Sequence, residues 1–170
     1  MKAPQTPIAD QPTAMTDQIV TRTATLKDLD TLLRFEQGIV MTERPFDPTL
    51  KEGHIHYYDL AEMIAAPHIE VVVATLGEVI IGSGYGRIEN SKPYLQHAQH
   101  AYVGFMYVSP EHRGKGVNQK IIEALKQWAL SQNMTEMRLD VYADNLSAIK
   151  AYEKAGFAPH LLQMRLGLDS

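Results

Sequence analysis

The spacing of apolar residues changes once along this chain, and that change restricts the fold more than any other feature. From residues 26 to 66, apolar residues recur every three or four positions, as on one face of a helix. From Ile69 onward, short segments rich in β-branched residues are separated by turn signals, which predicts strands at 69–75, 79–88 and 101–108. Helices followed by consecutive strands indicate a mixed α/β fold.

The rest of the chain continues this mixed pattern. We expect strands at 19–24, 137–142 and 161–168, and helices at 26–41, 57–66, 117–132 and from Asn145 to Gly156. The helix at 117–132 joins the strand ending at Val108 to the strand beginning at Met137, so these two strands should be parallel neighbours with a right-handed connection. The predicted sheet is therefore mixed, mostly antiparallel, with one parallel strand pair and flanking helices.

The length of 170 residues suits one domain, which we place at 18–170. Residues 1–17 contain three prolines and lack the apolar stretch of a signal peptide, so we expect a flexible leader there. No apolar run is long enough for a membrane span. The cytoplasm is the expected compartment.

Composition excludes several classes of chemistry. The chain has no cysteine, which rules out a disulfide framework, thiolate zinc, an iron–sulfur cluster and a cysteine nucleophile. The net charge of −4 gives no electrostatic basis for binding nucleic acid or an anionic membrane, and favours small-molecule or cationic partners. His54 and His56 have strand-like spacing but no clear third ligand, so we predict no metal site.

The segment most suggestive of a binding site runs from Met106 to Val117, a strand followed by a loop with two glycines and the start of a helix. Such a loop exposes backbone N–H groups beside a helix N-terminus, which favours phosphate oxygens, and Arg113 and Lys115 add positive charge. An ordinary strand-to-helix turn is the alternative. The Walker and dinucleotide-binding glycine patterns both fail at this loop.

Two motifs carry a resemblance to a known family. Arg113-Gly114-Lys115-Gly116-Val117-Asn118 resembles the acetyl-coenzyme A loop of the GCN5-related N-acetyltransferase family, Arg/Gln-x-x-Gly-x-Gly/Ala, with Asn118 in place of the last small residue. Residues 145–157 are similar to the family signature Asn-x-x-Ala-x-x-x-Tyr-x-x-x-Gly-Phe. The motifs occur in the family's order, and the resemblance covers residues 19–168.

The resemblance implies an acyl-CoA N-acyltransferase fold, in which the parallel strand pair is splayed and acetyl-CoA enters the wedge. It assigns pantetheine to the backbone of Met106, Tyr107 and Val108, and the pyrophosphate to Arg113, Gly114, Lys115, Gly116, Val117 and Asn118. Asn145 would contact the cofactor and Tyr152 would protonate the departing thiolate. Without the resemblance, Asn145 is a helix cap and Tyr152 is a core residue.

The sequence does not identify the general base. The strand glutamate of many relatives is missing from 103–106, and Glu36, Glu43, Asp140 and Tyr107 are alternatives acting through water. Carboxylates outnumber cations between the first two helices, which suits an amine acceptor. We name Glu36, Glu43 and Tyr58 as candidate acceptor-binding residues.

These features together predict a cytoplasmic N-acetyltransferase. It would transfer the acetyl group of acetyl-CoA to a primary amine by direct attack in a ternary complex. The alternative is a catalytically silent acyl-CoA-binding or interaction module, suggested by the missing strand glutamate and by Asn118. The resemblance also allows a homodimer.

Overall fold

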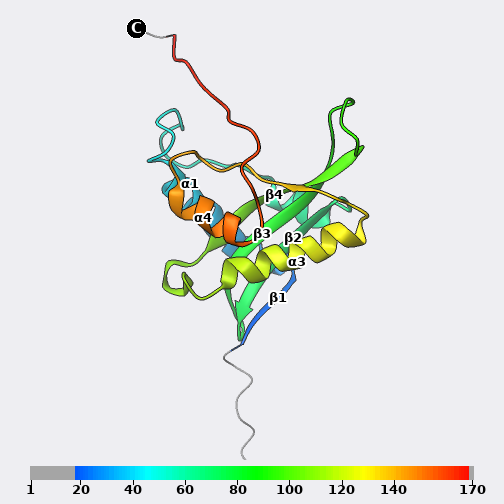
Figure 1. Ribbon diagram of the computed structural model, residues 1–170. Helices are drawn as coiled ribbons and strands as arrows, with labels where there is room; N and C mark the ends of the chain where they lie inside the picture. Colours follow the sequence, from blue (N-terminus) through cyan, green and yellow to red (C-terminus); the bar gives the residue numbers. More distant parts are fainter. Residues whose placement is uncertain (1–17, 169–170) are drawn as a thin grey trace, which may run out of the picture.

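The computed structural model describes residues 18–168 and contains a five-stranded sheet with helices on both faces (Figure 1). The elements in chain order are β1 (Ile19–Thr23), η1 (Leu26–Asp28), α1 (Leu29–Glu43), α2 (Leu60–Ala65), β2 (Ile69–Leu76), β3 (Val79–Asn90), β4 (Gln99–Val108), η2 (Pro110–His112), α3 (Val117–Ser131), β5 (Met137–Arg138) and α4 (Leu146–Lys154). None of the helices in the described part is long and apolar enough to cross a membrane.

The sheet has the strand order β1-β2-β3-β4-β5. The first three pairings are antiparallel, whereas β4 and β5 are parallel and connected through α3. This confirms the predicted fold class, a mixed and mostly antiparallel sheet with one parallel pair. That pair is very short, because only Ala101↔Met137 and Tyr102↔Arg138 are in register.

Strand β2 shows how the core is divided. Val71 and Val73 belong to the core on the side of α1 and α2, whereas Val72 and Ala74 belong to the core on the side of α3. Successive side chains of a strand point to opposite faces, so a continuous run of apolar residues is buried on both sides. Figure 1 shows α3 crossing one face of the sheet, with α1 behind it.

Glycines in β3 allow α3 to lie close to the sheet. A Cβ atom added to Gly84 would lie 2.7 Å from Cγ2 of Ile121, and one added to Gly86 would lie 2.6 Å from the ring of Trp128. Both distances are far inside normal contact. The helix that precedes β5 is therefore fixed tightly against the strands that precede it.

The C-terminal part differs most from the sequence prediction. The predicted strand at 161–168 is wrong, because residues 158–168 form no strand and no backbone hydrogen bond of the described chain involves them. The predicted strand at 137–142 is shortened to Met137–Arg138, since β4 turns away beyond Tyr102. An alternating pattern favours an extended backbone, but a strand also needs a partner with free hydrogen-bonding groups.

The helix boundaries shift for local reasons. The helix predicted at 57–66 begins only at Leu60, because Asp59 caps it with Oδ1 accepting from the N–H of Glu62 at 3.0 Å. The helix predicted at 26–41 is divided into η1 and the longer α1, which ends at Glu43. The predicted leader, residues 1–17, lies outside the described residues.

Candidate functional site

A cavity of about 180 Å³ lies where β4 and β5 separate. Its lining comes from α1, β4, the segment after β5, α4 and the loop before α2. The residues that line it are Ile39, Glu43, Tyr58, Tyr102, Val103, Gly104, Phe105, Met106, Leu139, Asp140 and Tyr152. The cavity thus brings together chain segments that are far apart in sequence.

A bulge in β4 opens this cavity. Tyr85 of β3 is opposite Gly104, and Ser83 is opposite Tyr107, so Phe105 and Met106 together face a single β3 residue. Phe105 has a φ of 54°, the left-handed backbone region that is rare for a bulky residue. The bulge bends β4 just after its last pairing with β5. Sequence reasoning missed it, although a glycine inside a strand, Gly104, is a signal for such a bulge.

Two carboxylates and three hydroxyls line the cavity. Burial raises the pKa of Glu43, the nearby Tyr57 hydroxyl partly opposes the shift, and the negative charge of Asp47 raises it further. Asp140 accepts a hydrogen bond from the Tyr102 hydroxyl at 3.0 Å, which occupies one of its oxygens. Glu43 therefore has the carboxylate better suited to accept a proton.

Tyr152 contributes a phenol from α4. Burial, with a smaller effect from Glu43, raises its pKa to about 12, so the hydroxyl stays protonated at neutral pH. Its ring packs edge-on against Phe157 with a centroid distance of 6.0 Å. The side chain is half-buried and is one of the residues that line the cavity.

Glu36 is placed differently from Glu43 although both lie on α1. Its side chain is fully buried, and its oxygens accept from the N–H groups of Tyr57 and Tyr58 at 2.7 and 2.9 Å and lie 2.9 Å from Nδ1 of His56. With all these partners, Glu36 anchors the loop before α2 and does not line the cavity. Tyr58, which it helps to position, lies on the cavity wall with its ring 5.3 Å from that of Phe105.

The predicted phosphate loop lies between η2 and α3. Gly114 and Gly116 have φ values of 74° and 80°, a region that glycine adopts without strain, and a Cβ on either would meet only open space. No acceptor in the described chain pairs with the N–H groups of residues 114–116. Gly116 caps α3 without a side chain, so the first-turn N–H groups of the helix are open as well. The loop offers a row of free donors to an anion.

Few side chains around this loop reach its binding surface, which therefore consists mainly of backbone groups. Arg113 turns back, with Nε donating to the carbonyl of Val108 at 3.2 Å, while Lys115 is exposed. Val117 is buried in the core beside α3, and Asn118 is half-buried. A ligand at the loop would therefore meet N–H groups first and the Lys115 ammonium second.

At the end of β4, backbone groups are also available for binding a ligand. The ring of Tyr107 packs on Phe35 at 4.6 Å, and Met106 and Val108 pack against the core beside α3. Beyond Tyr102, β5 no longer pairs with β4, so alternate N–H and C=O groups of β4 face the gap. An extended ligand with amide groups could pair with this edge as an added strand.

Helix α4 connects the loop and the cavity. Oδ1 of Asn145 accepts from the N–H of Ala148 at 3.2 Å, which confirms the predicted helix cap. Nε2 of Gln119, in the first turn of α3, donates to the carbonyl of Ala151 at 3.1 Å. This bond holds the start of α3, next to the phosphate loop, beside the helix that carries Tyr152.

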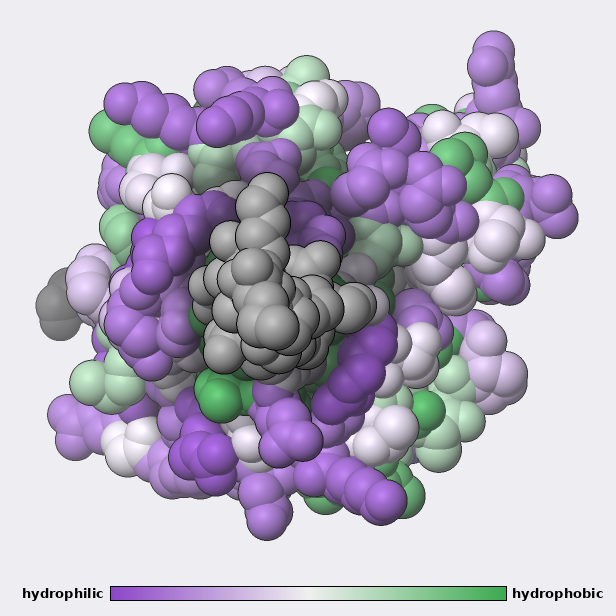
Figure 2. Space-filling view, turned by 90° about the horizontal axis from the view of Figure 1, so that it is seen from below, coloured by the Kyte–Doolittle hydropathy of each residue, from purple (hydrophilic) through white to green (hydrophobic). Residues whose placement is uncertain are grey.

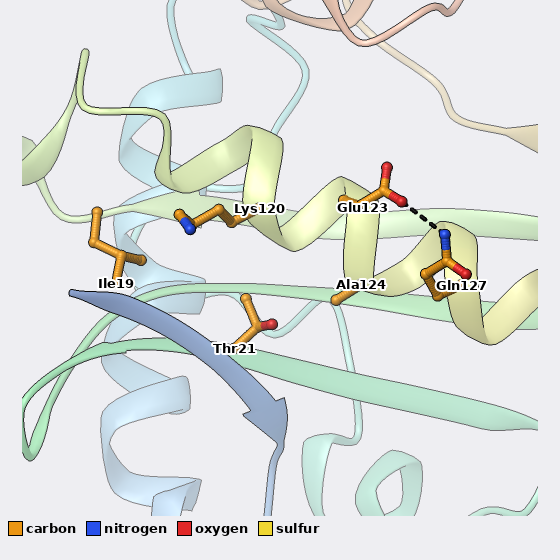
Figure 3. Close-up of a pocket in the computed structure, with 6 residues that line it drawn as sticks. All are labelled: Ile19, Thr21, Lys120, Glu123, Ala124 and Gln127. Atoms are coloured by element: carbon orange, nitrogen blue, oxygen red, sulfur yellow. Dashed lines mark hydrogen bonds between the residues drawn. The ribbon is translucent and has the colours of Figure 1, made fainter.

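A second hollow lies between β1 and α3 and has a volume of about 270 Å³ (Figure 3). Its lining includes none of the predicted site residues. Glu123, its one carboxylate, accepts from Nε2 of Gln127 at 2.7 Å, one helical turn further along α3. Although this hollow is larger, it brings together no set of groups suited to a reaction.

Metal-ligating side chains are not clustered in the described chain. The rings of His54 and His56 lie 4.7 Å apart, and no group of three His, Asp or Glu residues among residues 18–168 is arranged to hold an ion.

Sequence comparisons match this chain to known acetyltransferases. It is 28% identical over 117 residues to the uncharacterized N-acetyltransferase YobR of Bacillus subtilis, a match that covers 67% of this chain and 41% of the relative. It is 42% identical over 57 residues to a streptothricin acetyltransferase of Escherichia coli, covering 34% of this chain and 33% of that one. The matched segments span about a third to a half of the length of the curated relatives.

Comparisons of structure agree on the fold. A mutant of the BH1408 protein of Bacillus halodurans superposes with a TM-score of 0.79 at 19% identity, covering 88% of this chain and 99% of that one. A predicted acetyltransferase of Clostridium acetobutylicum, solved with acetyl-CoA, has a TM-score of 0.66 at 19% identity, with 89% and 97% covered. The profile of the Acetyltransferase (GNAT) family matches residues 38–157, which is more than half of the chain. The chain belongs to the GNAT acetyltransferase family.

Proposed function

We propose that this protein is an acetyl-CoA-dependent N-acetyltransferase that acts on a primary amine by direct attack in a ternary complex. The observation that carries the proposal is the cavity at the divergence of β4 and β5, which Glu43 and Tyr152 line together, with the open N–H groups of residues 114–116 at the start of the helix that contacts α4. Family membership supports acetyl-CoA as the donor. Such a site holds a donor, an acceptor and two proton-transfer groups together.

Donor binding follows from the backbone. The free N–H groups of Gly114, Lys115 and Gly116, with the start of α3, suit the pyrophosphate, since they provide donors and a partial positive charge without bulky side chains. The unpaired edge of β4 at residues 106–108 suits the amides of pantetheine. Asn145 lies at the start of α4, which shares the cavity wall.

The reaction needs one base and one acid. The amine nitrogen attacks the thioester carbonyl, forming a C–N bond while the C–S bond breaks, and the ammonium proton goes to the carboxylate of Glu43. Tyr152 gives its proton to the departing sulfur, and the proton taken up by Glu43 returns to the tyrosinate through solvent. A raised pKa makes Glu43 a stronger base than an exposed carboxylate, and the high pKa of Tyr152 keeps its proton available.

The placement of the other candidates favours Glu43 as the base. Glu36 is buried and already holds the loop before α2, Asp140 is bonded to Tyr102, and the Tyr107 ring packs on Phe35. Two carboxylates in one small cavity also favour a cationic acceptor over an anionic one. We further propose that the protein works in the cytoplasm.

A panel of amines tests this function. The full chain is incubated with acetyl-CoA and polyamines, amino acids, lysine analogues such as thialysine, or antibiotics with free amines such as streptothricin, with free thiol as the readout and calorimetry for acetyl-CoA binding. We expect thiol release with at least one amine. Acetyl-CoA binding without thiol release on any amine would instead support the silent acyl-CoA-binding module.

With an active amine, Glu43→Gln tests the base. We expect kcat to fall about 100- to 10,000-fold. In the wild type the rate should rise with pH as Glu43 loses its proton, at a pH above the ordinary range of a glutamate, and this step should disappear in the variant. Glu52→Gln is the matched control, because Glu52 is exposed in the loop that follows α1. An unchanged kcat in Glu43→Gln would mean that another group accepts the proton of the attacking amine.

A further inference from the structure

Two buried side-chain atoms of residues 18–168 have no hydrogen-bond partner, Nδ1 of His112 and the hydroxyl oxygen of Tyr57. Such groups are rare in folded proteins. Most polar side chains are open to water instead, as on the face in Figure 2, which is mainly hydrophilic around the grey atoms. Nδ1 of His112 lies 3.8 Å from Oε1 of its neighbour Glu111. The Tyr57 hydroxyl differs, because the carboxylate near it comes from another element.

That carboxylate belongs to Glu43 in the last turn of α1. The two side chains are close enough for each to shift the pKa of the other, although no hydrogen bond joins them in this structure. Burial raises the pKa of Tyr57, and the nearby Glu43 raises it further, so the hydroxyl keeps its proton and can donate it to a hydrogen bond at neutral pH. Glu43 lines the cavity and Tyr57 does not. Tyr57 therefore approaches this carboxylate without taking up space in the cavity.

The loop that carries Tyr57 is fixed to α1 by side chains of that helix and of its cap. Oε1 of Glu36 accepts from the N–H of Tyr57 at 2.7 Å. The guanidinium of Arg44 donates to the carbonyls of Lys51 and Gly53 at 2.8 and 2.5 Å. The ring of Tyr57 packs against the core on the side of α1 and α2. The same helix thus carries the proposed base and holds the backbone from which this phenol extends.

We propose that Tyr57 is a positioning residue for Glu43: when an amine enters the cavity, the Tyr57 hydroxyl donates a hydrogen bond to one carboxylate oxygen and leaves the other directed at the ammonium. The inference rests on the proposed function, in which Glu43 is the base. The proton that moves goes from the ammonium to Glu43, and the Tyr57 proton stays on its own oxygen. A carboxylate held by a second hydrogen bond reaches the reactive geometry more often than one that rotates freely.

The surroundings of Glu43 give this contact a measurable sign. Burial and the charge of Asp47 raise the pKa of Glu43, whereas the Tyr57 hydroxyl lowers it, because a donor stabilises the charged carboxylate. Loss of the hydroxyl should therefore move the titration of Glu43 to higher pH. The titratable groups that face Glu43 or share its cavity are Asp47, Tyr57, Tyr58, Asp140, Tyr142 and Tyr152.

With an amine that the full chain acetylates, Tyr57→Phe tests the positioning role in the reaction. We expect kcat at neutral pH to fall about 5- to 50-fold, the rise of the rate with pH to move to higher pH, and acetyl-CoA affinity to stay unchanged. Tyr94→Phe is the matched control, because Tyr94 is 81% exposed in the loop between β3 and β4. A pH profile of Tyr57→Phe that coincides with the wild type would overturn the proposal.

A double-mutant cycle shows whether Tyr57 acts through Glu43. In the Glu43→Gln background, adding Tyr57→Phe should change kcat by less than about 2-fold, because the group that it positions is already gone. Urea unfolding checks the fold of each variant, and Tyr57→Phe should be at least as stable as the wild type, since it removes a buried donor without a partner. A full additional loss of kcat in the double variant would contradict a role through Glu43.

Nuclear magnetic resonance of the glutamate carboxyl carbons tests the contact without any substrate. In the ¹³C-labelled full chain, Glu43→Gln identifies the signal of Glu43, and its titration should move to higher pH in Tyr57→Phe but not in Tyr94→Phe. An unmoved titration would overturn the proposal whether or not an amine is acetylated. A moved titration with an unchanged kcat in Glu43→Gln would instead reject the proposed base, and with it the catalytic use of this contact.

Discussion

The two sides of the cavity belong to regions that are held in place very differently. From Ala24 to Ala129 the chain contributes every buried residue of the described structure, including both cores around the sheet. From residue 130 to residue 168 none is buried. Among the cavity residues, Glu43 and the bulge of β4 belong to the first region, whereas Asp140 and Tyr152 belong to the second.

Apart from the short β5 pairing and the packing of Met137 and Leu139 on the core beside α3, the C-terminal region is attached by individual polar and aromatic contacts. Gln119 reaches the carbonyl of Ala151, and Asp47 accepts from Arg165 and, at 3.4 Å, from Tyr142. Such exposed or half-buried bonds each contribute little, so this region should open at a lower free energy than the sheet. The site therefore has one rigid wall and one wall that can move when a ligand enters or leaves.

The sharpest test of this contrast is a pair of truncations. Leu125 is fully buried on α3, and Leu125→Ala should lower the free energy of unfolding by about 2–5 kcal/mol through lost burial and a residual cavity. Ile149→Ala on the uncovered α4 should cost less than about 1 kcal/mol. Urea unfolding measures both. Equal losses would mean that α4 is packed as firmly as α3 and would contradict this contrast.

Tyr152→Phe tests the mobile wall without disturbing its packing. The substitution keeps the ring and removes only the hydroxyl, so stability should change little. We expect kcat to fall by about 10- to 1,000-fold, with acetyl-CoA affinity only modestly altered, because the hydroxyl acts on the departing sulfur.

Tyr142→Phe provides the control for this tyrosine. Tyr142 is a half-buried tyrosine whose hydroxyl bonds Asp47, and it does not line the cavity. It should keep nearly full activity. An unchanged kcat in Tyr152→Phe between pH 6 and 9 would exclude the acid role and leave the donor site unaffected.

Gly116→Glu tests the loop that belongs to the rigid region. The side chain would place a charge and bulk where the N–H groups face open space, and we expect acetyl-CoA to bind about 10- to 100-fold more weakly in calorimetry. Arg113→Ala should lose less, since Arg113 is directed toward Val108.

Backbone strain needs its own control, because Gly116 has a φ of 80°. Gly77→Glu introduces the same residue at a φ of 59°, also in open space, in the turn between β2 and β3. The two variants should lose similar stability, and only Gly116→Glu should lose affinity. Normal acetyl-CoA binding by a folded Gly116→Glu would remove the loop from the site.

The smallest expected effect concerns the pH dependence of the rigid region. A hydrogen bond from Arg22 lowers the pKa of Asp28 to about 2, and the N–H of Thr25 adds to the shift. A lowered pKa in the folded state stabilises the protein above the ordinary aspartate pKa, and this gain is lost as the pH falls from about 4 to about 2. Urea unfolding at several pH values should show a weaker decline across this window for Asp28→Asn. Parallel curves for both proteins would contradict the pairing.

Much of the fold follows from local pattern. The apolar period predicted β1 to β4, α1 and α3 to within a few residues, because each element buries a face that its own sequence marks. The strand predicted at 161–168 was wrong because strand formation also depends on a partner, which the local sequence pattern does not reveal. Alternation makes a segment suitable for a sheet, but the ladder requires a second strand at the right place.

The site shows the same division between local and tertiary information. The loop glycines, Gly114 and Gly116, could be found from sequence, because positive φ values and open N–H groups are properties of a few consecutive residues. The bulge at Phe105 was not found, since it depends on how β4 pairs with β3.

Glu36 and Glu43 show what each level of structure decided. Both are glutamates on α1, two helical turns apart and therefore on the same side of the helix, and the sequence determined that much. Only the tertiary structure separated them. The loop before α2 closes over Glu36 and satisfies its oxygens, whereas Glu43 lies beside the gap between β4 and β5. Their surroundings come from distant parts of the chain, and for a carboxylate the surroundings determine whether it anchors a loop or exchanges a proton.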